Sequence, residues 1–340
     1  MTRFLVGCYT DGDGGEGVGL TVAAHDPASG AWTVEQPAVG GVIVSPTYLV
    51  AGPDGPVLAV SETPDGAVHA LRLTGSAGPS VVSSGSTGGD FPCHLAVDPS
   101  GRWVVSANYG SGSLAVHPLT ADGVGARAAL VEHAGSGPDP DRQAGPHVHM
   151  IHYVTDTLLL AVDLGIDAIV AYRLDPNSGT LTETHRSALP AGFGPRHVVT
   201  LPGDRLAVAG ELAGEIALAA VDRETGAVTV LDRRTGTAAD EQYGPSAILA
   251  TADGRFVLLA NRGPDTVASF GVDGDRLVPV SEIPTGGEHP RDMTLVGDLI
   301  YVANQNDHTI TVLEVDPSTG AVSRRDEVLS LPSPTRLLPI

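Results

Sequence analysis

Seven short segments of this chain share one pattern, in which a proline is followed by a mostly apolar run. F-P-C-H-L-A at 91–96, G-P-R-H-V-V at 194–199 and H-P-R-D-M-T at 289–294 are examples. A repeat constrains the fold more than any other feature here, because each copy must form the same supersecondary unit. The spacing between successive copies is 44 to 54 residues. The prolines that head the segments are Pro46, Pro92, Pro146, Pro195, Pro245, Pro290 and Pro334.

Each repeat carries a second apolar run, which ends in a polar residue just before a turn. W-V-V-S-A-N at 103–108 and V-L-L-A-N at 257–261 are examples. Further short runs follow, separated by turns of the D-P-x-S/T-G kind, which is typical of consecutive antiparallel strands. The residues at the ends of the second runs are Tyr9, Glu62, Asn108, Asp163, Glu211, Asn261 and Asn304.

A period of about 48 residues with about four strands in each copy is the signature of a β-propeller blade. We therefore predict an all-β, seven-bladed β-propeller with four-stranded antiparallel blades, built as one domain over residues 1–340. The chain begins inside a repeat and ends after a lone first strand, S-P-T-R-L-L at 333–338. We expect this C-terminal strand to pair with the N-terminal blade and close the ring, which leaves no unpaired sheet edge.

The acidic balance of the chain narrows the classes of partner. Its formal net charge is −21, and its isoelectric point is near 4.7. Such a surface repels nucleic-acid backbones and anionic lipid, so we expect neither nucleic acid nor a membrane as a partner. Two cysteines, Cys8 and Cys93, are too few for a disulfide framework, and no apolar run reaches the roughly 18 residues that span a bilayer. With no N-terminal signal pattern, we expect a cytoplasmic protein.

The first strand of each propeller blade lines the central channel, and the second strand runs back beside it. Residues close to the seven prolines and residues at the ends of the second strands are therefore expected to meet at one end of the channel. Arginine binds carboxylate or phosphate with two hydrogen bonds, and histidine transfers protons near neutral pH, so this pocket suits an anionic small molecule. The candidates are His94, His147, His149, Arg196, His197, His289, Arg291 and Asp292 from the first group, and Asn108, Glu211, Asn261 and Arg262 from the second.

These residue types are also compatible with purely structural roles. A histidine in a propeller channel can simply be solvated, and Glu211 can serve only as the ion-pair partner of an arginine. Several arginines at one mouth repel one another unless an anion joins them, which favours a binding site. The run H-V-H-M-I-H suggests a metal site, but strand alternation puts His152 on the face opposite His147 and His149. We expect no metal and no cofactor.

A further set of segments follows the repeat, namely P-H-V-H-M at 146–150, D-L-G-I-D at 163–167, G-P-R-H-V at 194–198, G-E-L at 210–212, A-N-R-G at 260–263, H-P-R-D at 289–292 and V-A-N-Q-N at 302–306. Together these segments resemble the seven-bladed propeller lactonases of the bacterial 6-phosphogluconolactonase type, which are related to carboxy-cis,cis-muconate lactonising enzymes. The resemblance implies metal-free hydrolysis of a sugar lactone, typically 6-phosphoglucono-δ-lactone, in the pentose phosphate pathway. It also implies that His149, Arg196, Glu211 and Arg262 carry the chemistry.

We hypothesise that one of His149 and Glu211 activates a water molecule, that the other protonates the ring oxygen, and that Arg196 stabilises the oxyanion. Arg262 and Arg291 would hold a carboxylate or a phosphate. Two alternatives remain, namely a lactone-forming cycloisomerase and a non-catalytic binding or scaffold propeller. We expect a monomer or a weak homo-oligomer. The other substrate-binding candidates are His94, Asn108, His147, His197, Asn261 and His289.

Overall fold

The structure is a computed structural model that describes residues 1–11, 15–39, 43–52, 56–74, 78–239 and 244–340. The described residues form β-strands joined by turns and loops, and none of their segments is a helix long and apolar enough to cross a membrane. The chain divides into two compact units. The first unit comprises Met1–Pro37, Arg196–Val221 and Thr229–Ile340, and the second comprises Ala38–Pro195 and Asp222–Val228.

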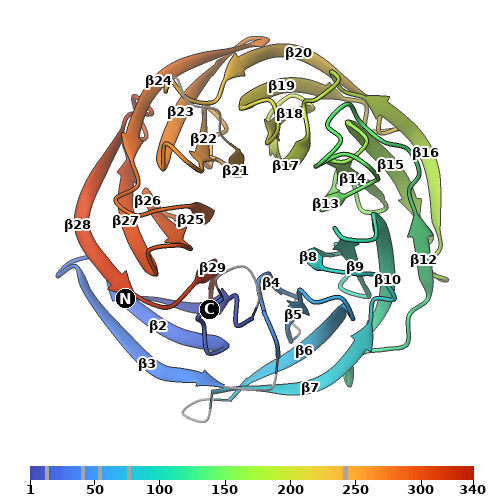
Figure 1. Ribbon diagram of the computed structural model, residues 1–340, viewed down its shortest axis with the longest axis horizontal. Helices are drawn as coiled ribbons and strands as arrows, with labels where there is room; N and C mark the ends of the chain where they lie inside the picture. Colours follow the sequence, from blue (N-terminus) through green and yellow to red (C-terminus); the bar gives the residue numbers. More distant parts are fainter. Residues whose placement is uncertain (12–14, 40–42, 53–55, 75–77, 240–243) are drawn as a thin grey trace. The chain divides into compact units, whose positions relative to one another are not determined.

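The first unit contains four antiparallel sheets of four strands each (Figure 1). In each sheet the strands hydrogen-bond in chain order, apart from the C-terminal strand. The sheets are β29 (Pro334–Pro339), β1 (Thr2–Cys8), β2 (Leu20–Asp26) and β3 (Ala31–Val39); β17 (Pro195–Leu201), β18 (Arg205–Gly210), β19 (Glu215–Val221) and β20 (Val228–Thr235); β21 (Pro245–Ala250), β22 (Phe256–Asn261), β23 (Thr266–Asp273) and β24 (Arg276–Pro284); and β25 (Pro290–Val296), β26 (Leu299–Asn304), β27 (Thr309–Val315) and β28 (Val322–Ser330).

The second unit contains three sheets of the same plan. One of them departs from the predicted four strands because its outer strand is split, so that β11 and β12 both pair with β10. The sheets are β4 (Leu49–Ala51), β5 (Val57–Ser61), β6 (Ala67–Thr74) and β7 (Gly78–Ser86); β8 (Pro92–Val97), β9 (Trp103–Asn108), β10 (Ser113–Thr120), β11 (Gly123–Val124) and β12 (Ala129–Glu132); and β13 (Val148–Tyr153), β14 (Leu158–Asp163), β15 (Ala168–Leu174) and β16 (Leu181–Ala188).

The two chain ends share one sheet, as predicted. The C-terminal strand β29 pairs antiparallel with β1, and Leu338 lies opposite Leu5. An unpaired β1 would expose a row of backbone donors and acceptors, so this pairing satisfies the edge with the chain's own last strand.

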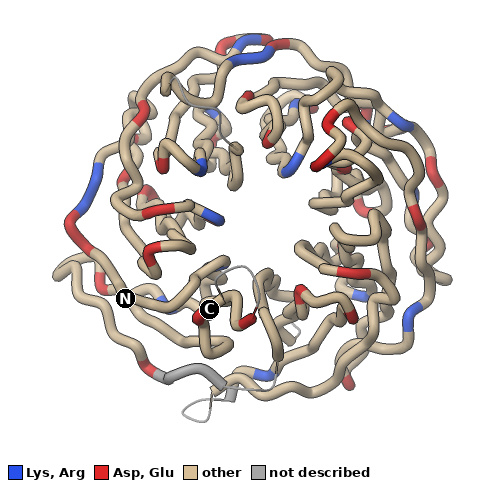
Figure 2. Tube along the Cα trace, viewed as in Figure 1, with Lys and Arg blue, Asp and Glu red and all other residues tan. Residues whose placement is uncertain are grey.

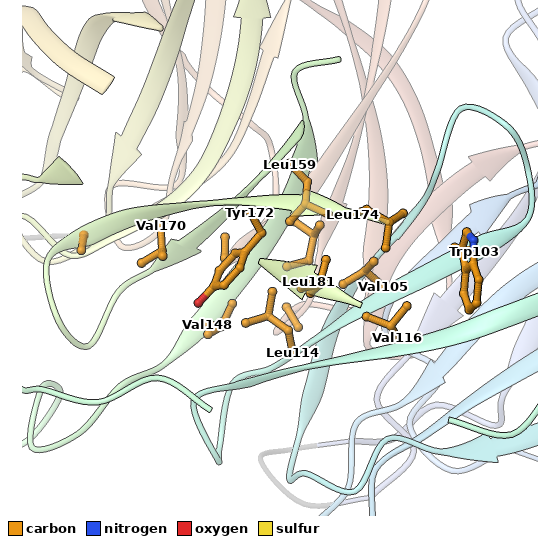
Figure 3. Close-up of a cluster of buried hydrophobic side chains, with 14 residues drawn as sticks. Trp103, Val105, Leu114, Val116, Val148, Leu159, Val170, Tyr172, Leu174 and Leu181 are labelled. Atoms are coloured by element: carbon orange, nitrogen blue, oxygen red, sulfur yellow. The ribbon is translucent and has the colours of Figure 1, made fainter. Parts of the chain in front are cut away.

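Burial follows the order of strands within a sheet. The second strands β9, β14 and β22 are buried at every residue, whereas the outer strand β20 alternates between buried or half-buried and exposed positions. In the second unit, Val105 and Leu114 of one sheet pack against Leu159 and Val170 of the next (Figure 3). All four are fully buried, and each such side chain contributes about 1.5–3 kcal/mol by leaving water.

The backbone is irregular at several of the prolines that head first strands. A β-bulge follows several of these prolines, since the register shifts between Pro92 and His94 and between Pro290 and Asp292. A bulge places one extra residue opposite its partner strand and re-aims a side chain, a device common beside active sites. The residue before the proline has a positive φ at Ser45, Phe91, Gly194, His289 and Ser333.

Candidate active site

The predicted residues at the ends of the second strands occupy two different positions. Asn108 and Asn261 are the last residues of β9 and β22, whereas Glu211 and Arg262 are the first residues after β18 and β22. Arg262 therefore holds the place in its sheet that Glu211 holds in the preceding sheet. The sequence pattern had grouped Glu211 with the asparagines.

Arg196, Glu211 and Arg262 form one ion-paired cluster in the first unit. Nε of Arg196 lies 3.0 Å from Oε2 of Glu211, and Nη2 of Arg262 lies 2.7 Å from the same oxygen. The side chains of Arg196 and Glu211 are only 3% and 5% exposed, and that of Arg262 is 14% exposed. Nε of Arg262 also donates to the carbonyl of Gly244 at 3.2 Å, which orients its guanidinium group.

Arg291 lies at the head of β25 and is held by Tyr9. Its Nη2 donates to the Tyr9 hydroxyl at 2.6 Å, and its guanidinium carbon lies 5.3 Å from the centre of the Tyr9 ring. Tyr9 is the first residue after β1, so it occupies the same place in its sheet as Glu211 and Arg262. The sequence marked Tyr9 as the end of a second strand, but its contact with Arg291 was missed, because the two residues lie 282 positions apart.

The cluster has an excess of positive charge. Arg196, Arg262 and Arg291 carry three cationic groups, and Glu211 carries one carboxylate. Burial and these three guanidinium groups lower the pKa of His289 to about 4, against the opposing effect of Glu211. At neutral pH His289 is therefore uncharged, and the formal excess of two positive charges comes from the arginines alone. We call these five residues the arginine cluster.

This local excess contrasts with the chain as a whole. Acidic residues are spread over the described chain, many of them in turns, rather than gathered in one run (Figure 2). An anion that binds beside these guanidinium groups reduces the repulsion between them. In a protein whose net charge is −21, this local positive excess favours a binding site for an anion.

Two further predicted residues of the first unit each contact an arginine. Nη1 of Arg196 lies 3.4 Å from Nδ1 of His197, so the buried His197 ring serves as an acceptor for that guanidinium. Asp292 is paired with Arg336 of β29 at 2.8 Å, which balances a further arginine.

The second unit holds the candidate His149. Its Nδ1 lies 3.8 Å from the Cys93 sulfur, and the Tyr109 ring meets it edge-on at 5.6 Å between ring centres. Tyr109 also contacts His147, which stacks on its ring at 4.5 Å and hydrogen-bonds its carbonyl through Nδ1 at 2.8 Å. Tyr109 is the first residue after β9, the same place in its sheet that Glu211 occupies.

The strand alternation expected over 147–152 is interrupted. Strand β13 begins at Val148, and its register shifts between Val148 and Met150, so His149 lies in a bulge. Val148 faces the last residue of β14, as Pro92 faces the last residue of β9. His149, rather than His147, is thus the structural counterpart of the residue that follows Pro92.

Three of the remaining candidates have contacts within their own sheets or with a neighbouring sheet. Nδ2 of Asn108 donates to the Ser113 hydroxyl at 3.0 Å, and Nδ2 of Asn261 donates to the Gly236 carbonyl at 2.8 Å. His94 stacks on Tyr48 with ring centres 4.2 Å apart and is almost fully buried. Their part in substrate binding stays a prediction. Among the residues that the structure describes, no three His, Cys, Asp or Glu side chains are grouped to hold a metal ion.

Nearly the whole chain matches a single family model. That model is described as the lactonase, 7-bladed β-propeller family, and it matches residues 3–339. This chain is a member of that family. Membership confirms the predicted seven-bladed β-propeller and the prediction that the protein is an enzyme, a lactonase. A non-catalytic scaffold is thereby set aside.

Individual relatives of this lactonase agree with that assignment. It is 30% identical to the 6-phosphogluconolactonase of Bacillus subtilis, over 98% of this chain and 97% of the relative. A solved structure from Lactobacillus plantarum is 32% identical, with a TM-score of 0.90 and 99% of both chains covered. The periplasmic gluconolactonase of Pseudomonas aeruginosa is 28% identical, with a TM-score of 0.91 and coverage of 100% and 99%. With a periplasmic protein among the similar structures, the cytoplasmic location stays a prediction.

Proposed function

We propose that this lactonase hydrolyses a sugar lactone, with 6-phosphoglucono-δ-lactone as its first candidate substrate. The observation that carries the proposal is the buried Glu211 carboxylate between the guanidinium groups of Arg196 and Arg262, at 3.0 and 2.7 Å. The relatives named 6-phosphogluconolactonase, from Bacillus subtilis and Formosa agariphila, support the choice of substrate.

Hydrolysis adds water across the ester bond of the ring. A base takes one proton from water, the water oxygen bonds to the carbonyl carbon, and the carbonyl oxygen becomes an oxyanion. The bond from that carbon to the ring oxygen then breaks, and the ring oxygen takes up a proton. The product is a hydroxy acid, which ionises and releases one proton at neutral pH.

Arg196 and Glu211 suit the first half of this sequence. Two guanidinium partners keep Glu211 in its charged form, so its carboxylate is available to take a proton from the attacking water, although the same partners weaken it as a base. Arg196 keeps its charge throughout and is nearly fully buried, so it stabilises an oxyanion without the screening that water would impose. Arg262 and Arg291 add positive charge that favours the oxyanion and the carboxylate of the product.

His149 is the candidate for protonating the ring oxygen, and this role rests on the family resemblance. A neutral histidine cannot donate a proton until it has taken one up, so His149 must cycle through its protonated form near neutral pH. Replacing it by glutamine keeps a polar side chain of similar reach and removes proton transfer.

The test is a pH-stat assay that counts protons released from fresh 6-phosphoglucono-δ-lactone and from glucono-δ-lactone. We expect a rate far above the spontaneous one, and a loss of about 10²–10³-fold in kcat for Arg196→Ala. Arg233→Ala is the matched control, because Arg233 pairs with Glu215 at an exposed site on the outer strands of the same sheet. Circular dichroism must show that both variants are folded. Full activity in Arg196→Ala would contradict the assignment, and no acceleration of either lactone would contradict the proposed substrate class.

A further inference from the structure

A long loop of the second unit, residues 133–147, is clamped at both ends by one buried carboxylate. Oδ2 of Asp163 lies 2.6 Å from Nδ1 of His133, where the loop begins, and both side chains are fully buried. Oδ1 of Asp163 accepts the backbone N–H of His147, where the loop ends, at 2.8 Å. A loop of this length without regular strands is uncommon in a compact fold unless it has a function.

The interior of this loop is also ordered by its own side chains. The buried Gln143 amide donates to the carbonyl of Leu164 at 2.8 Å and accepts the N–H of Asp139 at 3.3 Å. The Asp139 carboxylate in turn accepts the N–H groups of Asp141 and Arg142 at 2.9 and 3.0 Å. Arg142 therefore projects from a backbone that is fixed on both sides of it.

The guanidinium group of Arg142 reaches the Tyr109 side chain. Its Nη2 donates to the Tyr109 hydroxyl at 3.2 Å, and Arg142 as a whole is exposed. The Tyr109 ring stacks on His147 and meets His149 edge-on. One aromatic ring thus lies between the arginine of the long loop and the candidate proton donor.

We propose that Arg142 is a specificity-determining residue, which binds the anionic group that a phosphorylated lactone carries away from its reacting carbonyl. The proposal rests on the proposed function, because it takes His149 as a residue at the reacting end of the substrate. A guanidinium presents five N–H donors in a planar fork, and this geometry matches the oxygens of a phosphate. The clamp at Asp163 and the Gln143 anchor reduce the entropy lost when an anion binds, because the loop is already ordered.

The first experiment compares KM and kcat of Arg142→Gln on 6-phosphoglucono-δ-lactone and on glucono-δ-lactone. We expect KM for the phosphorylated lactone to rise about 10- to 100-fold, as for loss of a charge-assisted hydrogen bond. We expect kcat, and both constants for the unphosphorylated lactone, to stay within about twofold. Arg142→Lys should recover part of the affinity, because lysine keeps the charge but lacks the planar fork. Arg102→Gln, at another exposed arginine of the second unit, is the control.

Equal changes for the two lactones in Arg142→Gln would show a structural role and overturn the inference. Unchanged kinetics for both would overturn it as well, while leaving the proposed function intact.

A second measurement does not depend on turnover. Calorimetric binding of 6-phosphogluconate and of gluconate to the folded protein should show a preference for the phosphorylated acid, and Arg142→Gln should remove that preference. If the wild-type protein hydrolyses neither lactone but shows this Arg142-dependent preference, the proposed function fails, and Arg142 remains the binding site for the phosphate group. If the wild-type protein does not prefer the phosphorylated acid, the inference fails whether or not the protein is active.

Discussion

Replacing Glu211 by glutamine tests whether its carboxylate is catalytic or only stabilises the fold. The carboxylate is 5% exposed and contacts two guanidinium groups at 3.0 and 2.7 Å. Removing one charge from a buried ion pair typically costs about 3–5 kcal/mol, and glutamine retains one acceptor, so we expect a loss of about 3 kcal/mol. If Glu211 is the base, kcat on the lactone should also fall by about 10²–10⁴-fold.

The expected decrease in Tm is small. A chain of 340 residues has an unfolding entropy of about 0.7 kcal/mol/K near its midpoint, so a loss of 3 kcal/mol lowers Tm by only about 4 °C. Differential scanning calorimetry and a pH-stat assay on the same preparation measure both effects. Glu215→Gln is the matched control, because its carboxylate pairs with Arg233 at an exposed site, where such pairs contribute about 0–1 kcal/mol. A Glu211→Gln variant with the lower Tm but nearly unchanged kcat would refute the catalytic role.

Two further predictions concern His289 and Asp163. The pKa of His289 falls to about 4 in the folded protein, so the unfolded chain binds the proton first and stability is lost as pH falls from about 6.5 to 4. Because His289 is half-buried, we expect its titration to lower the free energy of unfolding by about 2 kcal/mol. Urea unfolding of His289→Gln should therefore show a smaller loss of stability between pH 7 and 4.5 than the wild-type protein. Parallel pH dependences of the two proteins would contradict this. Asp163→Asn weakens the hydrogen bonds to His133 and to the N–H of His147, and it should lower the free energy of unfolding by about 1–3 kcal/mol while speeding proteolysis within 133–147. Wild-type stability and cleavage in that variant would show that the clamp does not hold the loop.

Much of the fold was readable from the repeat. Prolines spaced 44 to 54 residues apart predicted seven sheets, and the lone segment at 333–338 predicted that β29 would complete the N-terminal sheet. Both are local consequences of the pattern, because turn residues and apolar runs mark where each strand starts and stops. The split outer strand at β11 and β12 was not predicted, since edge strands carry weak apolar patterns.

The candidate site was only partly readable in the same way. The repeat predicted one pocket that contains Arg196, Glu211, Arg262 and Arg291. The first three are ion-paired neighbours in the first unit. Strand alternation failed at His149, because one bulge residue reverses the facing of all that follows it.

What the sequence determined by itself is the repeating unit, the number of its copies and the residue types available near the prolines. Tertiary structure decided which of those residues meet. The pairing of Tyr9 with Arg291 joins positions 282 apart along the chain, and no local pattern encodes such a contact. The placement of Arg142 on Tyr109 likewise depends on a loop held by Asp163 and Gln143. Irregular backbone has no period, so its course follows from buried hydrogen bonds that only the folded chain can form.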